Sequence, residues 1–253
     1  MGGAMLRGWL DSGTVTHVDI LEPYGYPRAP GLAVFTDAQA LINNARTPAA
    51  VILAVKPQVM NDVCAALKSF IPRDALVLSI AAGKTIASFE QTFGTTQPIV
   101  RVMPNTPAAI GKGISAAIAN KNVTAAQRTL ADQLLSAVSI VEWLDDESLM
   151  DAVTALSGSG PAYIFHLIET LAASGETIGL SPELSMKLAR QTVIGSAALA
   201  EADADIPAAT LRENVTSPGG TTAAALEVLM NGELQKIYNK ALAAAVKRGK
   251  ELA

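Results

Sequence analysis

Two continuous apolar runs in the first half of the chain constrain its fold most strongly. Residues 49–55 read AAVILAV and residues 75–80 read ALVLSI. Runs of this length are typical of strands that are buried on both faces of a parallel sheet. A helical pattern over residues 59–70 separates them, so the chain alternates strand, helix and strand. This alternation predicts a doubly wound α/β sheet.

Further segments extend the pattern on both sides. We expect a helix from the first residue to about residue 10, with Gly13 as its stop, and a strand over residues 16–21 that leads into a polar loop over residues 23–31. Thr124 and Gln127 have the spacing of a capping box. The remaining expected helices cover residues 37–45, 86–93 and 124–137, and the remaining strands cover residues 99–102, 113–118 and 139–143.

No strand pattern follows residue 144. Gly158, Gly160 and Pro161 interrupt an apolar helical pattern and predict a kink, and Ser181 with Pro182 begins another helix. Others begin near residues 208, 222 and 233. We therefore predict a dinucleotide-binding Rossmann-like domain over residues 1–144 and an all-helical domain over residues 145–253. The alanine-rich helices suit close packing in a dimer.

The composition of the chain indicates which kind of binding partner to expect. The formal net charge is −4 and basic residues do not cluster, which argues against nucleic-acid and membrane-surface binding and favours a small molecule. The apolar runs are too short to cross a bilayer and the chain has no secretory start, so we expect a cytoplasmic protein. Cys64 is the only cysteine and is expected in the core, while two histidines make a metal cluster or a Ser-His-Asp site improbable.

Unusual residues lie where the predicted strands end, which is where ligands bind in such sheets. Glu22 ends one strand and follows Gly2 by the spacing of the acidic residue that binds an adenosine ribose. The next strands end in AVKP (Ala54, Val55, Lys56, Pro57) and in SIAAG, which contains Ile80, Ala81 and Ala82. Separately, each is explained equally well as a surface carboxylate, a solvated lysine or a loop of small residues. Together they favour a dinucleotide site.

Gly2 precedes a helical run and looks like the last glycine of a G-x-G-x-x-G turn. The first strand and most of that glycine loop are missing from the chain on this interpretation. Asn105, in the rigid elbow RVMPNTP, offers a donor and an acceptor at another strand end, although it could serve only the turn.

A second anion-binding feature lies near the end of the chain. A helical run ends near Val215, and Ser217, Pro218, Gly219 and Gly220 lead into Thr221 and Thr222 at the start of the next helix. Adjacent glycines let a ligand approach the backbone, and the free N–H groups of a helix start attract a carboxylate or phosphate. The alternative is a threonine N-cap after a Pro-Gly turn.

These motifs together resemble one family. AVKP, SIAAG, RVMPNTP, DAVTALSGSGPAY, LARQTVIGSA and LRENVTSPGGTT occur in this order, and the set is similar to Δ1-pyrroline-5-carboxylate reductase over nearly the whole chain. The resemblance implies NAD(P)H-dependent reduction of a cyclic imine to L-proline, the last step of proline biosynthesis. It also implies a Rossmann domain, a helical dimerisation domain, active sites at the dimer interface and assembly of dimers into larger rings.

The resemblance also implies site residues. Thr222 would be catalytic, by hydrogen bonding to the imine nitrogen. Substrate binding would involve Glu147, Ser217, Pro218, Gly219, Gly220, Thr221 and Thr222, with helix capping as the alternative for Glu147. The cofactor-binding candidates are Met1, Gly2, Glu22, Asp37, Ala54, Val55, Lys56, Pro57, Ile80, Ala81, Ala82, Asn105 and Asn214, and no metal is expected.

Cofactor choice and two other activities stay open from the sequence. Glu22 would repel the 2′-phosphate of NADPH, but Arg28 could attract it, so either NADPH or NADH is possible. A β-hydroxyacid-type dehydrogenase shares the two-part organisation, but it would carry a catalytic lysine on the helix after residue 144, where none occurs before Lys187. A non-catalytic nucleotide-binding homologue is the other alternative.

Overall fold

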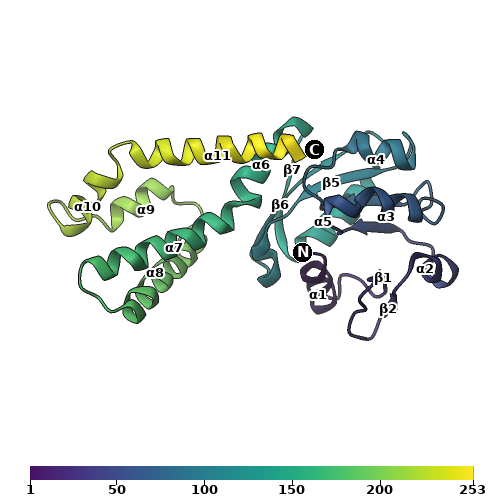
Figure 1. Cartoon of the computed structure of the whole chain (residues 1–253), viewed down its shortest axis with the longest axis horizontal. Coiled ribbons are helices and arrows are strands. Elements are labelled where there is room, and N and C mark those ends of the chain that lie inside the picture. The colour runs from purple at the N-terminus through teal and green to yellow at the C-terminus, as the bar shows by residue number, and fades with distance from the viewer. Residues whose placement is uncertain (253) are drawn as a thin grey trace. The chain divides into compact units, whose positions relative to one another are not determined.

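The computed structural model describes residues 1–252. It contains two compact units, one formed by Met1–Ser159 together with the C-terminal end from residue 245, and the other by Gly160–Ala244 (Figure 1). These two units are defined by packing within the chain. The predicted boundary after Leu144 separates two functional domains instead, and it stays a prediction.

Seven strands in the first unit form two sheets. Strand β1 (Val18–Leu21) pairs in parallel with β2 (Leu32–Phe35). The larger sheet has the order β3-β4-β5-β6-β7, in which β5 and β6 are antiparallel and the other three pairs of neighbouring strands are parallel. The bounds are Ala50–Leu53 for β3, Leu76–Ser79 for β4, Ile99–Met103 for β5, Gly113–Ala119 for β6 and Ser139–Trp143 for β7.

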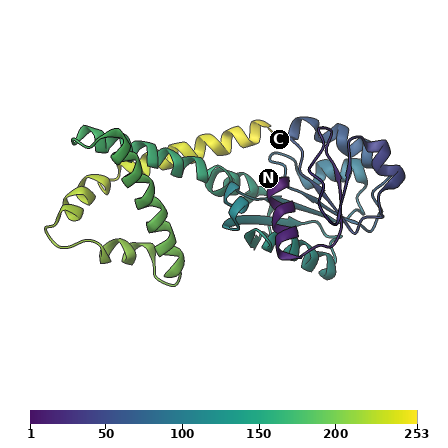
Figure 2. The same cartoon turned by 90° about the horizontal axis from the view of Figure 1, so that it is seen from below.

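Helices pack on both faces of the larger sheet, which explains why β3 and β4 are apolar on both faces (Figure 2). In β4, Leu76 and Leu78 belong to one apolar cluster and Val77 belongs to the other, as the alternation of side chains along a strand requires. The first cluster includes residues of α1 (Gly2–Ser12) and α5 (Ala125–Ser136), and the second includes residues of α2 (Ala38–Asn44), α3 (Met60–Leu67) and α4 (Ile86–Phe93).

The predicted elements of this unit are confirmed, with one omission. Gly13 ends α1 in the left-handed conformation, and the capping box of Thr124 and Gln127 is formed. The sequence pattern missed β2, because LAVF offers only four residues after a Gly- and Pro-rich loop. The remaining short elements are the 3₁₀ turns η1 (Pro57–Val59), η2 (Thr106–Ile110) and η3 (Glu147–Leu149).

The predicted kink near residue 158 is confirmed and takes a definite form. Helix α6 (Met150–Val153) continues into a π-helical turn over Thr154–Gly158, and α7 (Gly160–Thr177) follows. A π-turn is a recognised cause of helix kinks, and a bend at Ser159 separates this turn from α7.

The second unit is entirely helical but has almost no core of its own. Besides α7 it contains α8 (Pro182–Ala202, capped by Ser181), α9 (Ala208–Asn214), α10 (Thr221–Leu229) and most of α11 (Glu233–Leu252). Only Ala172, Ser185 and Ala189 are buried in it, at the contact of α7 with α8. Many apolar side chains elsewhere in it are exposed, among them Phe165, Leu188 and Ile194. None of the described helices has both the length and the apolar character required to cross a membrane.

Candidate functional site

Glu22 lies at the end of β1 and organises the turn that follows. Its backbone N–H donates to the carbonyl of Phe35 in β2, and its Oε1 accepts from the N–H of Tyr24 at 3.3 Å. The chain then turns at Gly25, which has φ of 78°. The carboxylate is thus half-buried at a strand end, where an acidic residue can reach a ribose hydroxyl. Arg28 lines a shallow hollow beside β2.

The start of α1 lies against the end of β3. A methyl group built on Gly2 would be 2.8 Å from the Cβ of Ala54, which is closer than real Cβ atoms approach one another. Gly2 therefore allows the positive end of an eleven-residue helix to reach this strand end. Ala54 and Lys56 are exposed there. Leu21, Phe35 and Val55, at or just after the ends of β1, β2 and β3, pack against the same apolar cluster.

The loop after β4 is held at the strand end by a buried serine. Ser79 is fully buried, and its Oγ accepts from the N–H of Ala81 at 3.3 Å. Ala82 is exposed at the tip, and Gly83 follows with φ of 73°. Because Ala81, Ala82 and Gly83 have little or no side chain, a flat ligand can lie against the backbone of this stretch.

These features fit a dinucleotide cofactor. A helix start suits a pyrophosphate, a carboxylate at a strand end suits a ribose, and loops of small residues suit a ring. All of them belong to the first unit.

Two other cofactor candidates have structural partners in the chain. Asp37 is exposed and caps α2, since its Oδ1 accepts from the N–H of Ala40 at 2.7 Å. Asn105 uses its side-chain oxygen to accept from the N–H of Ile114 at 2.9 Å, which joins the elbow to β6. These bonds explain both residues without a ligand, and their cofactor contacts stay predictions.

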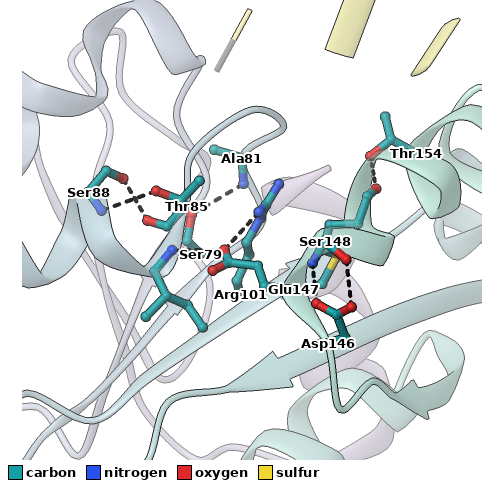
Figure 3. A network of polar contacts seen from close by, with 11 residues as sticks. Ser79, Ala81, Thr85, Ser88, Arg101, Asp146, Glu147, Ser148 and Thr154 are labelled. Atoms are coloured by element: carbon teal, nitrogen blue, oxygen red, sulfur yellow. Dashed lines mark hydrogen bonds and ion pairs between the residues drawn. The ribbon is translucent and has the colours of Figure 1, made fainter. Parts of the chain in front are cut away.

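Glu147 is also engaged by the protein. Its Oε1 accepts from the Arg101 guanidinium at 2.8 Å and from the N–H of Ile86 at 2.9 Å (Figure 3). The neighbouring Asp146 caps η3, and its hydrogen bonds from the Ser148 side chain and backbone lower the pKa of that carboxyl below its usual value. Helix capping, the alternative given for Glu147, is thus performed at η3 by Asp146. Glu147 instead reaches the start of α4.

The loop of residues 217–220 forms a turn directly before α10. The N–H of Gly220 donates to the carbonyl of Ser217, and Gly219 has φ of 68°. Gly220 is the N-cap of α10 and no side chain caps this helix, so the threonine-cap alternative is wrong. Ala224 is the first residue whose N–H bonds back along the helix, to Gly220, and therefore the N–H groups of residues 221–223 face outward. Thr222 is half-buried beside them.

The substrate candidates of this loop belong to the second unit, as does the cofactor candidate Asn214, which is exposed at the end of α9. The backbone N–H groups and the Thr222 hydroxyl provide donors for a carboxylate and for one further acceptor.

The sequence pattern missed Arg101 and Ser79. Both are buried polar residues within apolar strands, and a charge in the middle of IVRVM is the signal that could have identified Arg101. Cys64 is buried in the core as expected. Burial raises the pKa of its thiol to about 11 despite the opposing effect of Lys84, so the thiol is protonated at neutral pH.

Comparison with known proteins places this geometry in a family. Residues 147–252 match the family model described as pyrroline-5-carboxylate reductase dimerisation. The pyrroline-5-carboxylate reductase of Pseudomonas aeruginosa is 48% identical over 80% of this chain and 74% of its own length. That of Pisum sativum is 39% identical over 100% of this chain and 92% of its own length.

Solved structures agree. A pyrroline-5-carboxylate reductase from Coxiella burnetii is similar with a TM-score of 0.88 and 35% identity, covering 100% of this chain and 94% of that one. The Plasmodium falciparum pyrroline carboxylate reductase, solved with NADP bound, is similar with a TM-score of 0.83 and 31% identity, and the match also covers 100% of this chain and 94% of that one. The chain therefore belongs to the pyrroline-5-carboxylate reductase family.

Proposed function

We propose that this chain is a pyrroline-5-carboxylate reductase, which uses NAD(P)H to reduce the cyclic imine of 1-pyrroline-5-carboxylate to L-proline in the last step of proline biosynthesis. The relationship to a curated reductase over the full length of the chain carries this conclusion. The strand ends of the first unit and the α10 loop of the second supply donor groups of the kinds that the cofactor and the substrate need.

The cofactor site is proposed on the first unit. Gly2 and Ala54 bring the start of α1 to the pyrophosphate, Glu22 reaches the adenosine ribose, and the loop with Ala81 and Ala82 lies against the dinucleotide. The bound cofactor supplies a hydride. We assign the further contacts in this unit to Met1, Val55, Lys56, Pro57 and Ile80, whereas the cofactor contact of Asn214, which belongs to the second unit, stays a prediction.

The substrate carboxylate is proposed to bind at the start of α10. The outward N–H groups of Thr221 and Thr222 and the positive end of the helix favour a negative charge there. Glycine at position 220 suits this tight turn, because a Cβ there would lie 3.1 Å from the carbonyl oxygen of Ser217.

Thr222 is proposed to act on the imine nitrogen. Hydride adds to the imine carbon, the π electrons of the C=N bond move to nitrogen, and the nitrogen must end with a proton. A hydroxyl held at the helix start can donate a hydrogen bond to this nitrogen and relay a proton from water, so no histidine is required.

The second unit is proposed to form the dimer. A helical unit of 85 residues that buries only Ala172, Ser185 and Ala189 leaves most of its apolar side chains for a partner, and the matched dimerisation model covers these helices. We further propose that the dimers assemble into rings and that the protein is cytoplasmic. Light scattering on the purified chain would give the subunit number.

The activity test is direct. The purified chain is incubated with 1-pyrroline-5-carboxylate and either NADH or NADPH, and both oxidation of the nicotinamide and formation of proline are measured. We expect one proline for each nicotinamide oxidised, and the faster reaction identifies the preferred cofactor. Cofactor binding without proline formation would instead support the non-catalytic homologue.

A further inference from the structure

An arginine that is buried within the sheet begins the argument. The Arg101 side chain, in the middle of β5, is only 5% exposed. A guanidinium is always charged and is almost never buried without a partner. Its partner is Glu147, at 2.8 Å, whose side chain is 30% exposed (Figure 3). The pair therefore lies where the interior of the first unit opens to its surface.

The same carboxylate oxygen also binds the start of α4. Glu147 Oε1 accepts from the N–H of Ile86, the first residue of that helix. Thr85 caps the helix by accepting from the N–H of Ser88, so side chains engage two separate N–H groups of the first turn. A carboxylate at a helix start is further stabilised by the helix dipole.

This arrangement holds the loop between β4 and α4 at both of its ends. At the strand end, the Ser79 hydroxyl binds the N–H of Ala81, and at the helix end, Glu147 binds the N–H of Ile86. Residues 80–82 between these anchors are the ones assigned to the cofactor. Arg101 holds Glu147 through its hydrogen bond to Oε1. Among the described residues, Arg101 has no hydrogen bond to the loop itself.

We propose that Arg101 and Glu147 are positioning residues that fix the loop of residues 80–85 for the nicotinamide cofactor. The inference rests on the proposed reductase function and deepens it. Glu147 acts through the N–H of Ile86, and Arg101 acts through Glu147. A direct contact of Glu147 with the substrate, as the family resemblance implies, is the competing assignment.

The decisive variant is Glu147→Gln, which retains the shape and one carbonyl oxygen but removes the charge. We expect the dissociation constant of the reduced cofactor, measured by fluorescence titration, to rise about tenfold, because the loop loses its charged anchor. The KM for 1-pyrroline-5-carboxylate should stay within about twofold of wild type. Hydrogen exchange at the Ile86 amide should become faster.

Two further variants separate positioning from general loss of stability. Asp146→Asn removes the adjacent carboxylate, which bonds only Ser148 and does not reach α4, so it should leave cofactor affinity unchanged. Since Glu147→Gln leaves the Arg101 charge buried, the double variant with Arg101→Gln restores a neutral pair that can still accept from Ile86. We expect the double variant to recover much of the lost affinity.

Each other result overturns the inference. Unchanged Ile86 exchange would show that Glu147 does not hold the loop, and unchanged cofactor affinity despite faster exchange would show that this hold is irrelevant to the cofactor. A selective rise in the substrate KM would favour the substrate-contact assignment. If the wild-type chain binds neither NADH nor NADPH, the proposed function fails and the inference with it, whereas wild-type binding with unaffected variants refutes the inference alone.

Discussion

Replacing Gly2 by alanine should weaken cofactor binding through a single contact. The added methyl group would lie 2.8 Å from the Cβ of Ala54. Because carbon atoms rest about 3.5–4.0 Å apart, the start of α1 must move by about 1 Å away from β3. Met5, Leu6 and Trp9 anchor the rest of the helix in the core, so the movement concentrates at its first turn.

The expected magnitude follows from this displacement. A misplacement of about 1 Å at a binding or reacting group can lower function by up to about 100-fold, and we expect a loss of about tenfold in cofactor affinity, or about 1.4 kcal/mol. Global stability should change by less than the cost of about 1–3 kcal/mol for overpacking, because alanine is a better helix former than glycine.

The assay is a fluorescence titration of NADH and NADPH with four proteins: wild type, Gly2→Ala, Ala54→Gly and the double variant. Ala54→Gly removes the atom that the new methyl group would strike, so the double variant should bind more tightly than the effects of the two single changes predict. Strictly additive effects would show that the contact between the two positions does not set the affinity. Wild-type affinity in Gly2→Ala would refute the assignment of α1 to the cofactor.

Three further predictions test other parts of the molecule. Thr222→Ala should lower kcat about 100-fold while cofactor affinity stays constant, and Thr222→Ser should restore much of the rate; a kcat that does not depend on the hydroxyl would remove Thr222 from the chemistry. Glu22→Ser should raise the ratio of kcat/KM for NADPH to that for NADH about tenfold, because it removes repulsion of the 2′-phosphate, and an unchanged ratio contradicts this role. Ser185→Ala should raise the free energy of unfolding by about 1 kcal/mol in urea denaturation, because the buried Ser185 hydroxyl has no hydrogen-bond partner among the described residues. In contrast, Gly175→Ala should lower that free energy, since its methyl group would lie 2.8 Å from the same hydroxyl oxygen.

The order of helices and strands could be predicted because the signals are local. The buried strands β3 and β4 are apolar on both faces, α5 begins with a capping box, and α8 begins with a serine N-cap followed by proline. Strand β2 could not be predicted, because its sequence of four residues is too short to indicate a strand without its pairing with β1. The antiparallel direction of β6 could not be predicted either, because an apolar strand sequence does not indicate whether the strand pairs in parallel or antiparallel.

The candidate site was predictable where backbone geometry determines it. Adjacent glycines before α10 indicate a turn with open N–H groups, and the structure contains that turn. Side-chain partners were less accessible to prediction. The side chains of Asp37 and Asn105 can bind either a ligand or a backbone group, and the sequence does not distinguish these roles. In the structure they accept hydrogen bonds from the backbone N–H groups of Ala40 and Ile114, respectively.

Glu147 shows how a correct physical argument can be applied to the wrong element. An acidic residue at the beginning of a helical segment favours that helix through its free N–H groups and its dipole, and the sequence placed Glu147 at the start of the segment after residue 144. The carboxylate does lie at a helix start, but the helix is α4, whose Ile86 is 61 positions away in the chain. Arg101 carries the complementary signal, because a charge within the apolar strand IVRVM requires a buried partner. The sequence shows that such a partner must exist, and only the fold selects Glu147 from the 23 acidic residues of the chain.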